Sequence, residues 1–432
     1  MARKMKDSGI EWIGEIPEGW TCKRGKQLFV ETNERSKTGS EELLTVSHLT
    51  GVTPRSQKNV NMFMSESLVD YKVCHPGDLA ANTMWMWQGA IGVSRFHGVI
   101  SPSYNTYRQR TINYIPEYLD YLLRIRPLVD TYNAYSTGIT LSRLRLYPQS
   151  FLSIHFIVPP MDEQQKIATY LDVECSRIDA MLAKTRDSIE EYKKLKQAVI
   201  TQAVTKGVRG EREMKPTDFT RWSEIPFDWD LKRVKSCIAS ISSGLSAVTD
   251  DANSEESGEF VLRTSAVSSG FFVPTEVKPV LKSAVNRLIC PVEPDTLIVS
   301  RMNTASMVGA CAYVANNHPN TFLPDKLWKI KFLPSYHTKY MWYALNSVPA
   351  KSWFSELATG ASSSMQNISI NDFTSNYLPI PAFSEQKEIA NYLDAKCAEI
   401  DGLVAKKEQL VKELESYKKS LIYEVVTGKR EM

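Results

Sequence analysis

Apolar residues recur three, four or seven positions apart in two long stretches of the chain, with charged residues between them. The first stretch follows Pro160 and ends near Gly207, and the second follows Pro381 and ends near Gly428. This spacing predicts two helices of about 44 residues, each roughly 65 Å long. A helix with so long an apolar face would expose more apolar surface than a soluble chain tolerates. We therefore expect the two helices to pack against each other.

Two segments within these stretches, residues 163–179 and 385–401, are near copies that lie 222 positions apart. Ten of their seventeen positions are identical, whereas unrelated segments would share about one. Shorter motifs recur as well, as Thr137-Gly138 and Thr359-Gly360 and as Glu15-Ile16-Pro17 and Glu224-Ile225-Pro226. Each copy consists of a block whose sequence differs between the two copies, followed by a block whose sequence is largely the same in both. The sequence therefore predicts a pseudo-two-fold internal repeat.

Both ends of the chain match its middle. The triplet Arg212-Glu213-Met214 reappears as Arg430-Glu431-Met432, and Met214-Lys215 resembles Met5-Lys6. The carboxyl terminus thus stops about where the amino terminus begins. We expect a circular arrangement in which the two tails complete a second copy of the linker near residues 206–221.

Two-fold symmetry within one chain makes the predicted helix pair antiparallel. Residues expected at the seam between the helices are Leu171, Ile178, Thr185, Tyr192 and Val199 in the first helix and Leu393, Ile400, Lys407, Leu414 and Leu421 in the second. Thr185 and Lys407 are polar and repeat-equivalent, so antiparallel pairing would bring them together in one polar layer that fixes the register. Alternatively, the Lys407 side chain extends out of the seam into solvent.

The variable blocks have the patterns of mixed α/β domains. Strand-like runs occupy residues 43–49, 260–267, 296–302, 308–314 and 327–333, and helices are predicted at 116–124 and 338–347. The blocks are diverged copies, since Pro76-Gly77-Asp78-Leu79 aligns with Pro294-Asp295-Thr296-Leu297. The predicted fold is thus two tandem α/β domains joined by two long antiparallel coiled-coil spacer helices.

This pattern divides the chain into seven parts. They are an N-terminal segment (residues 1–17) that completes the circular repeat, a first variable domain (18–158), a first spacer helix (159–206), a linker (207–225), a second variable domain (226–380), a second spacer helix (381–427) and a C-terminal tail (428–432).

Composition adds little to this picture. The net charge is +3, and residues 18–150 carry 15 basic and 11 acidic side chains against 13 and 14 in residues 222–378. A DNA surface would therefore depend on local clustering of cations. Seven cysteines without a C-x-x-C pair indicate neither a disulfide framework nor a zinc site, and we expect Cys175 and Cys397 to be small core residues. No apolar signal core follows the start, so we expect a cytoplasmic protein.

Four motifs resemble one known family closely. They are the opening Ser8-Gly9-Ile10-Glu11-Trp12-Ile13-Gly14-Glu15-Ile16-Pro17, the segment Pro-Pro-x-x-Glu-Gln-x-x-Ile-Ala-x-Tyr-Leu-Asp at residues 159–172, Ile380-Pro381 with Glu385-Gln386, and the turn at residues 76–79. Over nearly its whole length the chain resembles the specificity subunit of type I restriction-modification systems.

This resemblance implies that each variable block is a target-recognition domain that reads one half of a split, asymmetric DNA site. It implies that the helices act as a spacer and dock two modification (methyltransferase) subunits. Those subunits would bind S-adenosylmethionine and methylate adenine, and restriction subunits with motor and nuclease activity would complete the complex. The specificity subunit itself would have no catalytic residues, no cofactor and no metal.

Candidate DNA-binding residues lie where polar and aromatic side chains interrupt apolar motifs, because such side chains contact base edges and phosphates. In the first domain they are Asn82, Thr83, Trp85, Gln88, Ser103, Tyr104, Ser142, Arg143 and Arg145. In the second they are Arg301, Asn303, Thr304, Lys326, Ser363, Gln366 and Asn367. Alternatively, Trp85 and Trp87 are core residues, Arg143 and Arg145 lie on a solvated face, and the serine run at residues 362–364 is a flexible loop tip.

Three other functional classes remain open from the sequence. A stand-alone methyltransferase would need a motif of the Asn-Pro-Pro-Tyr type, which the chain lacks. A coiled-coil scaffold without DNA would explain the helices but not two large diverged domains. A reader for a related restriction system with its nuclease on another chain would differ only in its partners.

Overall fold

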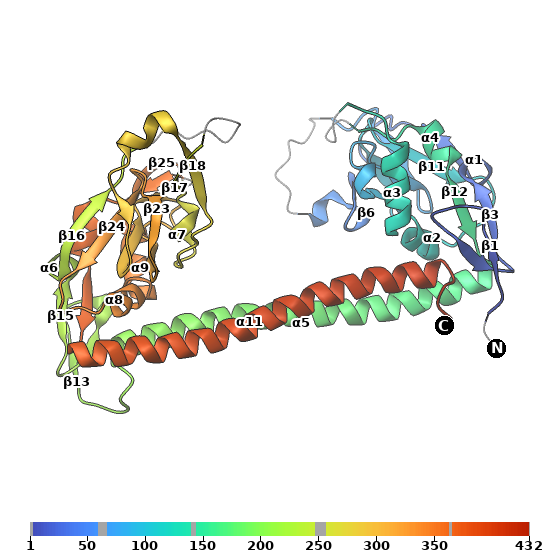
Figure 1. Ribbon diagram of the computed structural model, residues 1–432. Coiled ribbons are helices and arrows are strands. Elements are labelled where there is room, and N and C mark those ends of the chain that lie inside the picture. Colours follow the sequence, from blue (N-terminus) through green and yellow to red (C-terminus); the bar gives the residue numbers. More distant parts are fainter. Residues whose placement is uncertain (1–2, 59–66, 140–143, 247–255, 363–364, 432) are drawn as a thin grey trace. The chain divides into compact units, whose positions relative to one another are not determined.

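The computed structural model describes residues 3–58, 67–139, 144–246, 256–362 and 365–431. The chain forms two compact units, of which unit 1 comprises residues 1–186 and 408–432 and unit 2 comprises residues 187–407. Each unit contains a mixed head of helices and strands together with part of each of two long helices, α5 (Met161–Lys206) and α11 (Phe383–Val426) (Figure 1). Below, the first head is the described part of residues 3–158, and the second head is that of residues 214–380.

In the first head, the central sheet has four strands in the order β4-β11-β8-β9, and every neighbouring pair is antiparallel. The strands are β1 Met5–Asp7, β2 Glu15–Pro17, β3 Thr21–Arg24, β4 Phe29–Thr32, β5 Leu44–Ser47, β6 Gly51–Pro54, β7 Lys72–Cys74, β8 Leu79–Ala81, β9 Ile91–Val93, β10 Gly98–Ile100, β11 Asn105–Gln109 and β12 His155–Val158. The helices are α1 Gly25–Leu28, η1 Arg55–Gln57, η2 Met86–Gln88, α2 Pro116–Leu122, α3 Arg126–Tyr135 and α4 Pro148–Ser153.

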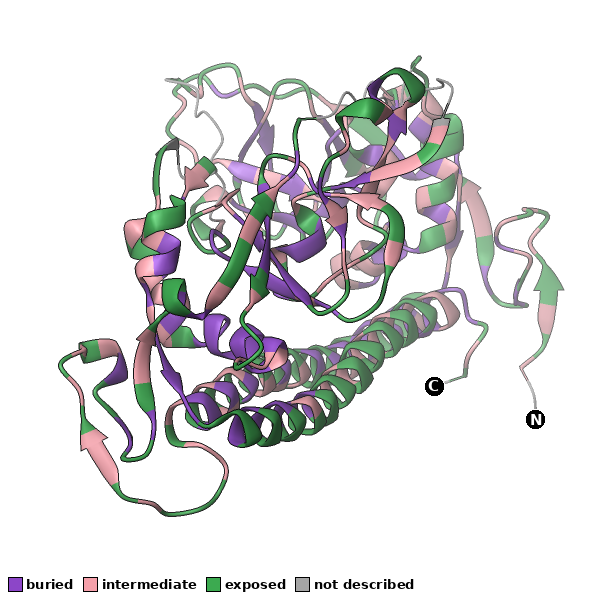
Figure 2. Cartoon of the chain, turned by 60° about the vertical axis from the view of Figure 1, so that its left-hand side comes forward, coloured by how far each residue is buried: buried purple, intermediate pink, exposed green. Residues whose placement is uncertain are grey.

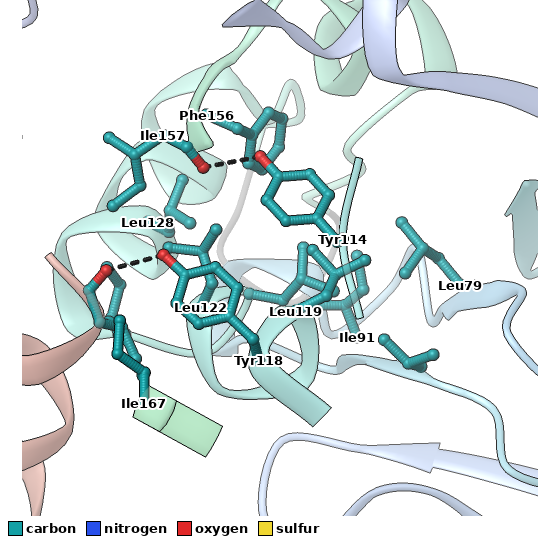
Figure 3. Close-up of a cluster of buried hydrophobic side chains, with 14 of the residues drawn as sticks. Leu79, Ile91, Tyr114, Tyr118, Leu119, Leu122, Leu128, Phe156, Ile157 and Ile167 are labelled. Atoms are coloured by element: carbon teal, nitrogen blue, oxygen red, sulfur yellow. Dashed lines mark hydrogen bonds between the residues drawn. The ribbon is translucent and has the colours of Figure 1, made fainter. Parts of the chain in front are cut away.

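Proline sets the start of several of these helices. A proline stands in the first turn of α2, α3 and α4, where the missing N–H group is not needed for the helical ladder. The core behind them contains buried tyrosines among aliphatic residues, and the hydroxyl of Tyr114 donates to the Ile157 carbonyl at 2.7 Å (Figure 3). The hydroxyl of Tyr118 donates to the Val426 carbonyl at 2.8 Å. Tyr118 thereby joins the head to the end of α11 within unit 1.

In the second head, a four-stranded sheet with the order β16-β24-β20-β22 is also antiparallel. The strands are β13 Met214–Pro216, β14 Glu224–Pro226, β15 Asp230–Arg233, β16 Ile238–Ser243, β17 Glu256–Leu262, β18 Val277–Leu281, β19 Pro291–Val292, β20 Thr296–Ser300, β21 Met302–Asn303, β22 Cys311–Val314, β23 His318–Phe322, β24 Leu327–Phe332, β25 Thr359–Ser362, β26 Met365–Asn367 and β27 Tyr377–Ile380. The helices are η4 Thr220–Trp222, α6 Val234–Cys237, α7 Ser265–Ser268, η5 Lys282–Arg287, α8 Thr338–Leu345, α9 Val348–Leu357 and α10 Ile370–Ser375.

The predicted mixture of helices and strands is confirmed, but the strand directions differ from an α/β arrangement. Most strand pairs in both heads are antiparallel, whereas β17 and β23 pair in parallel. Many of these antiparallel neighbours, such as β4 and β11 or β16 and β24, are far apart in the chain, whereas an α/β arrangement joins parallel neighbours through helical crossovers. Residues 265–267, which we predicted as the end of a strand, form the short helix α7 together with Ser268.

In each unit, the long helices run antiparallel. In unit 1 the Lys418 ammonium binds Asp179 at 2.6 Å, and Arg186 binds Glu415 at 2.5 Å. Leu171, Ile178 and Leu421 are buried in the same core, and Leu414 packs at its edge. Apolar residues of both helices therefore meet in one core while charged pairs flank it.

Unit 2 repeats this arrangement. The Lys196 ammonium binds Asp401 at 2.6 Å, the repeat-equivalent of the Lys418–Asp179 pair. Leu393 is buried in the core of this unit, Val199 packs against that core, and Ile400 is 6% exposed. Exposed residues, green in Figure 2, alternate with buried ones along both long helices.

The polar layer that we predicted from Thr185 and Lys407 is wrong. Thr185 donates its hydroxyl hydrogen to the Met181 carbonyl of its own helix at 2.8 Å, and the Lys407 ammonium lies 5.6 Å from the centroid of the Tyr192 ring. Tyr192 is seven residues beyond Thr185, about two helical turns. Lys407 covers an aromatic ring instead of meeting a second polar side chain.

The segment that we predicted as a plain linker contains a hairpin. Strands β13 and β14 pair antiparallel with Lys215 opposite Ile225, and β1 and β2 pair in the equivalent register with Lys6 opposite Ile16. The N-terminal segment and the linker thus form matching structures. Each hairpin leads directly into a buried tryptophan, Trp20 or Trp229.

The repeated Glu-Gln pair attaches each head to the start of a long helix. In unit 2 the buried carboxylate of Glu385 accepts hydrogen bonds from Arg212 at 2.5 Å and from Nε1 of Trp229 at 3.2 Å. In unit 1, Glu163 binds Arg3 and accepts from Nε1 of Trp20 at 2.8 Å. Arg3 therefore takes the place that Arg212 has in the linker.

The glutamine of each pair bonds to backbone groups of the head. Oε1 of Gln164 accepts from the Ile115 N–H at 3.0 Å, and Oε1 of Gln386 accepts from the His337 N–H at 2.8 Å. Both side chains are almost fully buried. These bonds satisfy the N–H groups just before α2 and α8, so the repeated glutamine is explained by structure and needs no catalytic role.

The turn before β8 and its counterpart before β20 have the same left-handed backbone despite different residues. Gly77 has φ +87° and Asp295 has φ +52°. Gly77-Asp78 and Asp295-Thr296 thus differ in sequence but share the left-handed backbone at their first position. Only a few residue types adopt positive φ cheaply, with glycine first and aspartate or asparagine next.

Replacing Gly77 with alanine should lower the free energy of unfolding by about 1–2 kcal/mol, because a β-carbon strains a left-handed backbone. No atom lies within 4 Å of the β-carbon that would be added, so the effect is conformational and not a clash. Gly77→Asn should cost clearly less, since asparagine tolerates this conformation. Urea denaturation checks both variants, and equal losses would contradict the explanation.

Cys175, Cys311 and Cys397 are buried. Cys175 and Cys397 are 5% and 4% exposed, as predicted for core residues, and removal from water raises the pKa of both thiols. Burial also raises the pKa of the Cys311 thiol to about 12. These thiols therefore stay protonated near neutral pH.

No helix in the described ranges has the length and apolarity that crossing a bilayer requires.

Candidate nucleic-acid interface

In the first head, the candidate residues gather around the connection between β8 and β9. Asn82, which directly follows β8, donates from Nδ2 to the Tyr104 hydroxyl at 2.8 Å, and its Oδ1 accepts from the Met84 N–H. The Thr83 hydroxyl donates to the Ser103 carbonyl at 2.9 Å. Two segments about twenty residues apart are thus joined into one surface. Burial raises the pKa of Tyr104, so its phenol remains neutral and can both donate and accept.

Two tryptophans form the most exposed aromatic feature of this surface. The rings of Trp85 and Trp87 stack with centroids 6.0 Å apart and an interplanar angle of 16°. Trp85 is 48% exposed, so the alternative that it belongs to the core is wrong. Gln88 is half-buried at the end of η2. A stacked, exposed indole pair beside amide and hydroxyl groups can contact bases or sugar faces.

The remaining candidates of the first head are only partly described. Ser142 and Arg143 lie outside the described residues. Arg145 forms an isolated antiparallel bridge with Thr137, and its guanidinium donates to the Leu144 carbonyl at 3.0 Å. Among the described residues, no hydrogen bond or ion pair joins Arg145 to the Asn82 cluster.

In the second head, backbone pairing brings the candidates together. Strand β21 pairs with β26 so that Asn303 lies opposite Gln366 and Met302 opposite Asn367. The Arg301 N–H donates to the Lys326 carbonyl at 3.1 Å, and its own carbonyl accepts from Ile368 at 3.0 Å. The segments near residues 301, 326 and 367 therefore lie side by side.

The chemistry of this second surface differs from that of the first. Lys326 is exposed and Arg301 half-buried, and neither has a carboxylate partner among the described residues. Asn303 is held in place, since its Nδ2 donates to the Ser268 hydroxyl at 2.9 Å and its Oδ1 accepts from the Thr304 N–H at 2.9 Å. Unpaired cations beside fixed amides suit phosphate oxygens and base edges. Ser363 lies outside the described residues.

Ser268 is a site residue that sequence reasoning missed. It lies on the short helix α7, 35 residues from Asn303. Its local sequence is an ordinary run of small and apolar residues, which gives no sign of a polar contact. Only the folded arrangement brings it next to Asn303.

The chain matches no protein-family model, but it has curated relatives. The EcoKI specificity subunit of Escherichia coli strain K12, a type I restriction enzyme subunit, is 24% identical over 272 residues, which cover 62% of this chain and 55% of the relative. The putative MjaX specificity subunit of Methanocaldococcus jannaschii is 23% identical over 322 residues, which cover 73% and 68%. The chain thus spans little more than half of the E. coli relative.

Two solved structures share the fold. One is a chain from a structure that describes complex assembly and conformational transition of the type I R-M system, with a TM-score of 0.71, 15% identity and coverage of 96% of this chain and 99% of that chain. The other is the HsdS subunit from Thermoanaerobacter tengcongensis, with a TM-score of 0.52, 16% identity and coverage of 96% and 98%. Identity this low shows the fold, and the curated relatives supply the sequence link. The resemblance that the motifs indicated is therefore confirmed: in sequence and in fold, this chain is a relative of the specificity subunits of type I restriction-modification systems.

Proposed function

We propose that this chain is the non-catalytic DNA-recognition subunit of a type I restriction-modification complex. One observation carries the proposal. The two heads have equivalent frameworks, but at the loop after β8 and the loop after β20 they present different side chains, with Thr83 and Trp85 in one and Arg301 and Asn303 in the other. Equivalent frameworks with unlike surfaces suit the reading of two different DNA half-sites.

The proposal extends to the form of the DNA site. Each head is a target-recognition domain that reads one half of a bipartite, asymmetric duplex sequence, and α5 and α11 set the spacing between the halves. A duplex suits such a reader because half-sites on it have fixed distance and rotation. The division into an N-terminal segment, two recognition domains, two spacer helices, a linker and a tail is part of this proposal.

The long helices are proposed to dock two methyltransferase subunits. In unit 2, Leu195, Tyr392 and Leu403 are 47%, 40% and 37% exposed on these helices. Exposed apolar side chains on a helix pair support a protein partner. The partners would bind S-adenosylmethionine and modify adenine, with restriction and motor subunits joining them in the cytoplasm, where genomic DNA lies.

A salt-dependent gel shift tests whether the chain binds duplex DNA. The purified chain, alone and with its methyltransferase partners, is titrated into a duplex library at rising salt. We expect a shifted band whose affinity falls steeply with salt, because phosphate contacts release counterions. Absence of a shift in both preparations would favour a scaffold that does not bind DNA. Methyl transfer by the chain alone would contradict the non-catalytic assignment.

Lengthening both spacer helices by four residues should lengthen the preferred gap between half-sites. The insertions are placed after Arg186 and after Lys407, and four residues add about 6 Å, which is close to two base pairs. Alanine substitutions at the same places, without insertion, serve as the control for altered helix surfaces. The measurement is the gap length in sites methylated by the complex, and an unchanged gap would show that the helices do not set it.

A further inference from the structure

A cavity of about 410 Å³ lies within unit 2, with walls from the second head and from both long helices. The Trp342 ring contacts Phe271 at a centroid distance of 5.4 Å and Tyr343 at 4.5 Å, and all three line the cavity. The rest of the lining is made of polar side chains, including the Asp401 carboxylate that Lys196 binds, and of the aliphatic residues Ile200, Ile400 and Val404. This volume, with aromatic walls and a few polar groups, is typical of small-molecule sites.

Asn346 leaves a buried acceptor without a donor at this cavity. Its Nδ2 donates to the carbonyls of Cys311 and Trp342 at 2.8 and 3.0 Å, whereas Oδ1 has no hydrogen-bond partner among the described residues. A β-carbon added to Gly270 would lie 3.2 Å from this oxygen. Since Gly270 and Phe271 form one wall of the cavity, the oxygen lies at that wall. A buried acceptor without a donor destabilises the empty state.

Lys351 supplies a cation at the same cavity. No carboxylate of the described residues pairs with its ammonium, and burial lowers the pKa of this group. The nearby Lys196 is engaged with Asp401 at 2.6 Å and lies 4.5 Å from the Phe271 ring centroid. An anion bound from solution would stabilise the charged form of the Lys351 side chain, which burial disfavours.

The first head offers an internal comparison at the repeat-equivalent positions. Asp120 and Arg124, at the places of Trp342 and Asn346, form an ion pair at 2.5 Å, and Oδ1 of Asp120 accepts from the Val93 N–H. Val129 stands at the place of Lys351. In unit 1, the side chains of Asp120 and Arg124 therefore pair with each other. In unit 2, among the described residues, the Lys351 ammonium has no carboxylate partner and Oδ1 of Asn346 has no donor.

We propose that the unit 2 cavity binds a small aromatic carboxylate that carries a hydrogen-bond donor, with one molecule per chain. The carboxylate binds the Lys351 ammonium, the ring packs against Phe271 and Trp342, and the donor binds Oδ1 of Asn346. This binding does not depend on the proposed function.

Isothermal titration of the full chain with 4-hydroxyphenylacetate tests the proposal. Two analogues isolate the two polar contacts: 4-hydroxyphenylacetamide lacks the charge, and 4-methoxyphenylacetate lacks the donor. We expect one site per chain and binding about tenfold weaker for each analogue, the usual effect of losing a hydrogen bond to a charged or buried group.

Two variants locate the site. Lys351→Met should bind the carboxylate and the carboxamide equally, whereas Lys396→Met, at an exposed lysine paired with Glu399 on α11, should behave like the unsubstituted chain. If Lys351→Met fails to fold, the analogue series on the unsubstituted chain decides. Absence of binding, equal affinity for the three probes, or two sites per chain would overturn the proposal.

Discussion

Replacing Glu385 with alanine should lower the free energy of unfolding of unit 2 by about 1–3 kcal/mol, the usual effect of leaving a buried donor without an acceptor. The Glu385 carboxylate is 1% exposed, and the Arg212 side chain is only 17% exposed. Without the carboxylate, Nε1 of Trp229 loses its acceptor, and the Arg212 guanidinium keeps only its bonds to the exposed Asp228 at 2.8 and 2.9 Å. The hairpin of the linker would then separate from the start of α11.

Hydrogen exchange in rising urea measures this loss separately in peptides of each unit. Glu388→Ala is the matched control, because Glu388 binds Arg209 nearby but is 46% exposed and should matter by less than about 1 kcal/mol. Glu163→Ala should destabilise unit 1 less than Glu385→Ala destabilises unit 2, since Glu163 is 26% exposed. Equal, small effects at Glu385 and Glu388 would contradict the anchoring role.

Replacing Arg301 with alanine should relax reading of one half of the DNA site by about 1–3 kcal/mol, a factor of roughly 5 to 150, and leave the other half unchanged. The guanidinium has no carboxylate partner among the described residues, and the backbone around it is fixed by Lys326 and Ile368. The substitution thus removes a reading group while the surrounding backbone bonds remain. Binding to duplexes with single changes in either half measures the effect.

Trp85→Ala is the reciprocal variant in the first head. Trp85 is half exposed and stacks only on Trp87 in the first head, so its removal should affect the opposite half-site. Two variants with opposite half-site defects would support two independent readers. Equal loss at both halves in either variant would show that the heads do not read separately.

The two long helices were predictable from this sequence because their patterns of apolar residues are long. The long helices end within a few residues of the predicted limits, since forty or more positions of apolar spacing average out local noise. Short strands have weaker sequence patterns. Residues 265–268, for example, form a helix although we predicted a strand through residue 267. The register of the helix pair was also beyond prediction, because it depends on which charged residues meet, as Lys196 and Asp401 do.

Side-chain partners across long sequence distances were less predictable. The repeat marked Glu385 and Gln386 as important, but their bonds to Arg212 and to the backbone at His337 required the folded chain. The candidate surfaces were predicted as regions, and the structure brings several members of each region together within each head, whereas Arg145 lies apart from the Asn82 cluster. Ser268 was missed because its contact with Asn303 has no local signature.

Sequencing of modified bases in the host genome, with and without this gene, tests the central claim most directly. The account predicts a methylated adenine motif made of two short defined halves with a fixed gap, present only with the gene, and degenerate in one half alone when the gene carries Arg301→Ala. A single continuous motif, or a modification pattern that does not change when the gene is removed, would contradict the account.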